Sequence, residues 1–143
     1  MDDLDRALIS LLAGDARMPL STLARRLKVA RSTVQARLER LETNGTIAGY
    51  TVRLGEAARA GRIKASVLLT VEPRAQATLV TRLRSIPEVE RASTCSGRFD
   101  LLVQLSAPSP AQIDSVLDAI GELPGVRASE SLIHLSTKID REG

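Results

Sequence analysis

The sequence predicts an α+β protein in which a winged helix-turn-helix precedes a ferredoxin-like βαββαβ domain. Two observations predict this order. The first third of the chain carries apolar residues with helical spacing. The remainder alternates strand-like and helix-like segments and contains an internal repeat. We therefore expect a first domain at residues 1–54, a linker at 55–63 and a second domain at 64–143.

Three apolar stripes predict three helices in the first domain. We expect Asp3 to cap the first helix, Pro19 to open the second and Arg31 to begin the third. The third helix should end near Thr43, because the following Asn44-Gly45 suits the left-handed geometry of a C-terminal cap. The residues that face the core are Leu4, Leu8, Leu11 and Leu12; Leu20, Leu23, Ala24 and Leu27; and Val34, Leu38 and Leu41.

The short connections complete the motif. Lys28-Val29-Ala30 is a three-residue break between the second and third helices. Residues 47–54 have the pattern of a β-hairpin wing, with Tyr50 expected to pack the wing against the helices. The linker has weak periodicity, two glycines and room for a helical turn. Three helices, a tight turn and a hairpin are typical of a winged helix-turn-helix.

The second domain contains a repeat at an interval of 37 residues, in which 83–89 (LRSIPEV) returns as 120–126 (IGELPGV). Each copy has a helix end, a turn at proline and a new strand. Strand patterns precede each copy at 64–71 and 99–106, and the intervening helices carry the stripes Leu79, Val80 and Leu83, and Ile113, Val116, Leu117 and Ile120. The resulting βαββαβ order leaves one sheet face without helices, so we expect that face to bind a second copy of the chain.

The net positive charge of the chain lies in the first domain. Residues 1–53 hold nine Lys/Arg and six Asp/Glu, whereas 54–143 hold eleven of each, so the net charge of +3 belongs to the first part. Residues 25–40 contain six basic residues and only one acidic residue, Glu39. Clustered basic charge is typical of a phosphate-binding surface, although a solvated helix face or a protein-contact bundle has the same composition.

The third helix is the candidate for reading base pairs, because such a helix places its N-terminal residues in the major groove. Arginine can pair with guanine, glutamine with adenine, and serine or threonine with bases or phosphates. The DNA-binding residues that we predict are Arg31, Ser32, Thr33, Gln35, Ala36, Arg37 and Arg40 on the third helix, with Thr22 on the second.

The pattern Leu4-Asp5, Leu23-Ala24, Arg37-Leu38, Leu41-Glu42 and Gly49-Tyr50, with the βαββαβ unit and its SGRFD segment at 96–100, resembles the Lrp/AsnC (feast/famine) family of bacterial and archaeal regulators. The resemblance extends from about Leu4 to Lys138. It implies a cytoplasmic transcriptional regulator that binds double-stranded promoter DNA as a homodimer and can assemble into tetramers or octamers. It also implies a small-molecule effector, such as an amino acid, held by Ser96, Gly97, Arg98 and Asp100.

The chemistry of the 96–100 segment fits such a ligand. The Asp100 carboxylate can pair with an α-ammonium group, and glycine lets a carboxylate approach the backbone amides. Asp100 can equally be a structural acceptor in a turn, and Arg98 can be an ordinary exposed residue. The chain departs from the family where Lys28, Ala30 and Pro19 replace the usual turn and capping residues, so operator preference cannot be transferred.

The composition limits other functions. We expect no catalytic residues, cofactor or metal, because one histidine and one cysteine cannot build a four-ligand zinc site. Sirohaem decarboxylases resemble this architecture, but they would need more histidines than His134, which we expect on a sheet surface. We expect Cys95 to pack in a strand. No apolar segment is long enough to span a bilayer, and the acidic residues after Met1 do not resemble a secretion signal.

Overall fold

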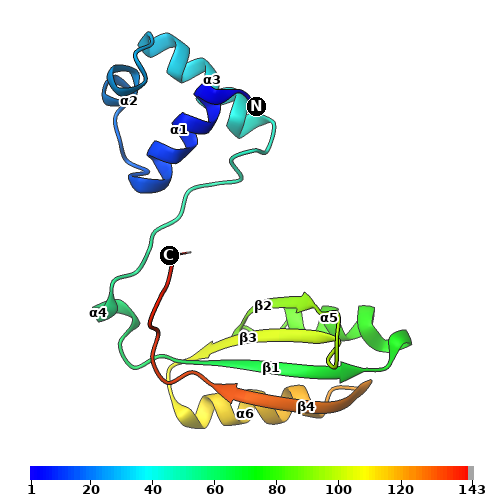
Figure 1. Ribbon diagram of the computed structural model, residues 1–143. Helices are drawn as coiled ribbons and strands as arrows, with labels where there is room; N and C mark the ends of the chain where they lie inside the picture. Colours follow the sequence, from blue (N-terminus) through cyan, green and yellow to red (C-terminus); the bar gives the residue numbers. More distant parts are fainter. Residues whose placement is uncertain (142–143) are drawn as a thin grey trace. The chain divides into compact units, whose positions relative to one another are not determined.

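The computed structural model describes residues 1–141, which form two compact units, Met1–Arg53 and a second unit that begins at Leu54. The first unit is helical, and the second is a four-stranded antiparallel sheet with helices packed against it (Figure 1). The α+β class, with a helix-turn-helix followed by a βαββαβ domain, is confirmed.

The first unit contains the helices α1 (Asp3–Gly14), α2 (Leu20–Leu27) and α3 (Arg31–Thr43). Its core contains the predicted stripes, with Leu8, Leu23, Val34 and Leu41 almost completely buried and Leu38 half-buried. The cap of α1 differs from the prediction, because Asp2 and not Asp3 is the N-cap. Asp2 and Asp5 form a capping box, in which each carboxylate accepts the other residue's backbone N–H.

The turn before α3 has unusual chemistry. Lys28 adopts left-handed geometry with φ of 57°, a conformation that side chains with a Cβ seldom take. No side chain caps α2 or α3, whose N-cap residues are Pro19 and Ala30. The N-terminus of α3 therefore keeps unpaired backbone donors at its surface.

The expected β-hairpin wing is not formed. No strand is assigned between residues 46 and 54, within the part of the chain that the structure describes. Ile47 is half-buried against the helical core, but most of the following residues are exposed. Tyr50 is 52% exposed, and its hydroxyl group is hydrogen-bonded to Glu42 of α3. An alternating pattern predicts a strand only where a partner strand can satisfy the backbone, and this segment has no such partner among the described residues.

The second unit follows the predicted order. A short helical turn, α4 (Glu56–Arg59), lies in the segment expected to be a linker. It is followed by β1 (Ile63–Val71), the 3₁₀ turn η1 (Pro73–Ala75), α5 (Gln76–Arg84), β2 (Val89–Thr94), β3 (Leu101–Ala107), α6 (Pro110–Gly121) and β4 (Val126–Ile133). The sheet order is β2-β3-β1-β4, as expected for two βαβ halves folded together.

The two faces of the sheet differ. On β1, Ala65, Val67, Leu69 and Val71 are buried in one core with residues of α5 and α6. The alternate residues of β1 point to the opposite face and are half-buried or exposed. The strands at the two edges, β2 and β4, are exposed along most of their length.

The sequence repeat corresponds to a repeated hydrogen-bond pattern. The N–H of Ile86 donates to the carbonyl of Leu83, and the N–H of Leu123 donates to that of Ile120. Both copies then make the same bond three residues later, at Val89 and at Val126. The second copy contains Gly125, which has φ of 94° and packs so closely on Ala75 that an added Cβ would lie 2.2 Å from the Ala75 Cβ.

Candidate DNA interface and effector loop

The N-terminal half of α3 presents polar side chains to solvent. Arg31, Ser32, Gln35 and Ala36 are exposed, and Thr33 is half-buried, as is Thr22 on α2. Gln35 approaches Glu39 one turn later at 3.5 Å, which leaves most of its amide free. The core side chains Val34 and Leu41 point in the other direction. The exposed surface of α3 is therefore free to enter the major groove of DNA.

Arg37 and Arg40, also predicted to bind DNA, are held by α1. Arg37 binds the carboxylates of Asp2 and Asp5, the latter at 3.3 Å, and Arg40 binds Asp5 at 2.8 Å. The Arg37 side chain is only 27% exposed. Sequence reasoning missed the two aspartates as partners. The spacing contained a signal, because Arg37 comes three residues after Val34 and four before Leu41 and must lie near the core-facing side.

The ion pairs between α1 and α3 shift the pKa values of Asp2 and Arg37. The hydrogen bond from Arg37, followed by that from the Asp5 amide, lowers the pKa of Asp2 from 3.8 to about 2. The same contacts with Asp2 and Asp5 raise the pKa of Arg37. Asp2 and Arg37 are therefore both charged at neutral pH and form a stable ion pair.

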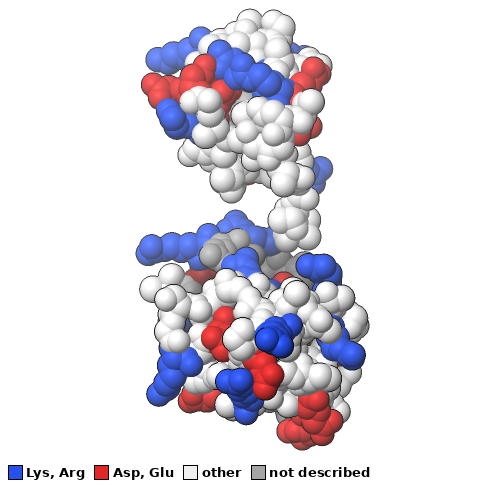
Figure 2. Space-filling view, turned by 90° about the vertical axis from the view of Figure 1, so that its right-hand side faces the viewer, with Lys and Arg blue, Asp and Glu red and all other residues white. Residues whose placement is uncertain are grey.

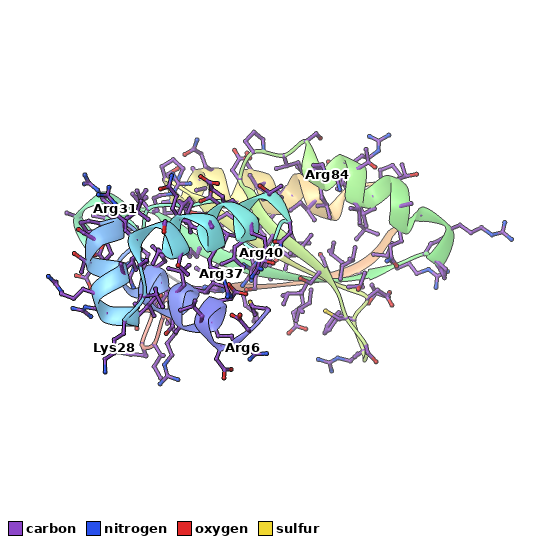
Figure 3. All side chains as sticks on the ribbon, turned by 90° about the horizontal axis from the view of Figure 1, so that it is seen from above. Arg6, Lys28, Arg31, Arg37, Arg40 and Arg84 are labelled. Carbon is purple, nitrogen blue, oxygen red and sulfur yellow. The ribbon has the colours of Figure 1, made fainter. Side chains whose placement is uncertain are left out.

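Other basic residues of the first unit stay unpaired. Within residues 1–141, no ion pair engages Arg25, Arg26, Lys28 or Arg31. They lie at the end of α2, in the turn and at the start of α3, whereas Arg37 and Arg40 lie toward the other end of α3 (Figure 3). In Figure 2 the first unit shows basic and acidic side chains next to one another, and not one large patch of a single sign.

The segment after α3 folds back on that helix through one hydrogen bond. The Tyr50 hydroxyl donates to Glu42 Oε1 at 3.1 Å. Partial burial, and then the hydrogen bond and charge of Glu42, raise the pKa of Tyr50. The sole tyrosine of the chain thus holds residues after Gly45 near the C-terminal end of α3.

The predicted effector residues lie in the loop between β2 and β3. Asp100 anchors this loop to the end of β1, because its Oδ2 accepts the Val71 N–H at 2.8 Å and its own N–H donates to the Leu69 carbonyl at 2.8 Å. Its carbonyl accepts the Cys95 N–H at 2.9 Å, which closes the loop. The structural role considered for Asp100 is therefore present, and it uses only one of the two carboxylate oxygens.

The other predicted effector residues, Ser96, Gly97 and Arg98, are exposed. Gly97 has φ of 140°, which favours glycine, and Ser96 is exposed beside it. The Arg98 guanidinium lies 5.0 Å from the centre of the Phe99 ring and 3.9 Å from Glu130 of β4, with 83% of its side chain exposed. Cys95 follows β2 and is exposed, so the prediction that it packs in a strand is wrong. The strand β2 ends at Thr94, one residue before Cys95.

The histidine lies at the sheet surface, as expected. His134 follows β4, is exposed, and its Nε2 lies 2.8 Å from the Ser66 hydroxyl. Among the described residues, no group of three or more His, Cys, Asp or Glu side chains could hold a metal ion. None of the described helices is both long and apolar enough to cross a membrane.

Comparison with known families assigns both units. The model of the AsnC-type helix-turn-helix domain matches residues 1–42, and that of the Lrp/AsnC ligand binding domain matches residues 64–143. The second match alone covers more than half of the chain. The chain belongs to the Lrp/AsnC family. It is a transcriptional regulator with a helix-turn-helix DNA-binding domain and a ligand-binding domain.

Individual relatives agree with this assignment. The HTH-type transcriptional regulator LrpA of Mycobacterium tuberculosis is 32% identical over 143 residues, covering 99% of this chain and 95% of the relative. An uncharacterised HTH-type transcriptional regulator of Pyrococcus abyssi is 30% identical, covering 96% of this chain and 88% of the relative. These relatives are named as regulators, and they give no support to the decarboxylase alternative.

Solved structures of the same fold cover nearly the whole chain. The leucine response regulatory protein LrpA of M. tuberculosis has a TM-score of 0.81 at 33% identity, covering 98% of this chain and 96% of that structure. AsnC of E. coli has a TM-score of 0.90 at 23% identity, covering 99% and 96% respectively. A transcriptional regulator of Neisseria meningitidis, solved as a complex with L-Met, has a TM-score of 0.89 at 22% identity, covering 98% and 93%.

Proposed function

We propose that this Lrp/AsnC regulator reads operator DNA with the N-terminal half of α3 and responds to an amino acid or a related metabolite bound at residues 96–100. The observation that carries the first part is the exposed set Arg31, Ser32 and Gln35 at an uncapped helix start. Free backbone donors and the helix dipole attract phosphate there, and these side chains can hydrogen-bond base edges. Ala36 offers an apolar contact, and Thr33 and Thr22 flank the same surface.

Basic residues beside that surface supply the sequence-independent part of binding. Arg25, Arg26 and Lys28 are exposed and unpaired within the described chain, so they can neutralise phosphates along the groove edge. Phosphate contacts fix the register of the protein, and base contacts at α3 then select the sequence.

The effector proposal rests on the loop between β2 and β3. Asp100 keeps one carboxylate oxygen available for an ammonium group. Gly97, whose positive φ favours glycine, has no side chain that would keep a carboxylate from the backbone there. The L-Met complex of a regulator with this fold makes amino acids the first class to test. We propose no metal or organic cofactor beyond this effector.

Assembly is proposed to use the sheet face that α5 and α6 leave free. Leu68 on β1 pairs with Leu102 on β3 and with Glu130 on β4, so apolar and polar groups share that face. A second copy would bury it and form a homodimer, and further contacts could extend the assembly to tetramers or octamers. We place this activity in the cytoplasm. Light scattering of the purified chain measures the assembly directly.

The DNA proposal is tested with a duplex selected from a random-sequence pool by the wild-type protein. Arg31→Ala and Gln35→Ala should each weaken binding to that duplex by about tenfold to a hundredfold at fixed salt, with unchanged light scattering. Arg6→Ala is the charge-matched control, because Arg6 lies on α1 and pairs only with the exposed Asp3. Wild-type affinity and selectivity in both α3 variants would refute the assignment of base-reading residues.

A further inference from the structure

Asp5 is the one charged residue among the fully buried side chains that the structure describes, and its setting connects α1 to α3. Its Oδ1 accepts from Arg37 at 3.3 Å, and its Oδ2 accepts from Arg40 at 2.8 Å and from the Asp2 N–H at 3.2 Å. A buried carboxylate is costly unless such partners compensate it. Here two guanidinium groups of α3 provide that compensation, so the position of α3 depends on α1.

The two arginines lie along one side of α3. Arg40 follows Arg37 by three residues, so both side chains emerge on neighbouring positions of the helix surface. Figure 3 shows them between α3 and α1, with Arg31 toward the opposite end of α3. The charges of Arg37 and Arg40 are therefore directed at carboxylates, whereas those of Arg31 and Lys28 remain free within the described residues.

We propose that Asp5 is a positioning residue for DNA recognition, which orients α3 through Arg37 and Arg40 and withholds both guanidinium groups from DNA phosphates. This inference rests on the proposed reading of DNA by α3. Withheld charge lowers the affinity for DNA of any sequence and leaves the choice of sequence to the N-terminal half of the helix. The ion pairs thus raise the selectivity of binding and do not supply affinity.

The effect of Asp5→Asn follows from this arrangement. Asparagine keeps the size of the side chain, but it no longer balances two guanidinium groups, so Arg40, whose side chain is already 55% exposed, can turn toward phosphates. Binding to random duplex DNA should tighten, and the slope of log affinity against log salt should steepen by roughly one for each phosphate gained. Selectivity for the chosen duplex over random DNA should fall by about tenfold, because α3 loses its alignment.

Asp3→Asn is the matched control. Asp3 lies on the same turn of α1 and loses the same charge, but its carboxylate is fully exposed and pairs only with Arg6. Asp2→Asn provides a second variant that folds readily, because asparagine caps helices well and Asp2 shares only Arg37. It should steepen the salt slope in the same direction by a smaller amount.

The measurements are made on the full chain at a temperature where circular dichroism shows native helix content. A slope and selectivity of Asp5→Asn or Asp2→Asn equal to those of Asp3→Asn would overturn the proposal. Equal weakening on chosen and random DNA would also overturn it, since a role confined to stability predicts that pattern. Failure of the proposed function is distinguishable, because then Arg31→Ala and Gln35→Ala would retain wild-type binding.

Discussion

The cores of the two units differ in the kind of polar group that they bury. The first unit buries six apolar residues, and it adds a buried carboxylate that is bound by two arginines. Among its described residues, the second unit buries thirteen apolar residues, and its one buried polar residue is the neutral Ser106. Apolar packing is non-directional, so three short helices around a small core gain orientation from specific ion pairs. In the second unit, strand pairing already orients the elements, and the alternation of buried and exposed residues fixes the register of the strands.

The difference extends to how each unit presents its candidate site. The first unit exposes side chains of one helix, whose reach depends on the orientation of that helix. The second unit exposes a loop that is anchored by backbone hydrogen bonds at Asp100 to a rigid strand end. Variants that affect the close packing of the sheet unit should therefore cost the most stability, and variants of the charged groups should chiefly change recognition.

The largest expected effect is that of Gly125→Ala. The added Cβ would lie 2.2 Å from that of Ala75 at a positive φ, so the variant should lose about 3 kcal/mol of unfolding free energy. Chemical denaturation of the full chain measures this change. Gly121→Ala is the control, because its nearest neighbour would lie at 3.8 Å and its free energy should change little. Wild-type stability of Gly125→Ala would mean that the close approach between Gly125 and Ala75 carries no constraint.

The next effect concerns the effector loop. Asp100→Asn keeps an oxygen that can accept the Val71 N–H, so the fold should survive, but it removes the negative charge proposed to bind an ammonium group. In a thermal-shift screen against the amino acids, an active ligand at a hundredfold excess over its Kd stabilises the wild type by about 2.7 kcal/mol. We expect that shift to disappear in the variant.

The control for this screen is Asp114→Asn, which removes the same charge from an exposed position on α6. It should respond to the amino acid as the wild type does. An undiminished shift in Asp100→Asn would remove Asp100 from the effector site and leave it with its structural role alone.

The smallest effect is a pH dependence confined to the first unit. The pKa of Asp2 is lowered from 3.8 to about 2, so its ion pair with Arg37 stabilises the fold above pH 3.8 and is lost as the pH falls toward 2. An NMR titration of the Asp2 carboxyl group should give a midpoint near 2 in the wild type and a higher midpoint in Arg37→Gln. Equal midpoints would show that Arg37 does not hold this carboxylate in solution.

Much of the architecture could be predicted because it depends on local patterns. Helical stripes located α1 to α3 nearly to the residue, and the 37-residue repeat predicted the βαββαβ order and its paired turns. The hairpin wing and the packing of Cys95 could not be predicted correctly in this way. The wing segment has no partner strand among the described residues, and Cys95 lies just past the end of β2, an edge strand that is exposed along most of its length.

The candidate DNA site was also predicted only in part. Spacing alone placed Arg31, Ser32 and Gln35 on the exposed face of α3 and the core stripe on the other. By their place in the sequence, Arg37 and Arg40 belong to the same basic helix. Their partners, Asp2 and Asp5, lie more than thirty positions away in the chain, and charge counted along the sequence cannot show such pairing.

By itself, the sequence determined the family, the two-part fold and the helix that faces outward, because these follow from the periodicity of apolar residues and from motif spacing. The tertiary structure alone decided which charges remain free. Ionic interactions depend on distance in space and on burial, so the basic surface predicted from composition became two groups of arginines. One is free at the start of α3, and the other is held by a buried aspartate of α1.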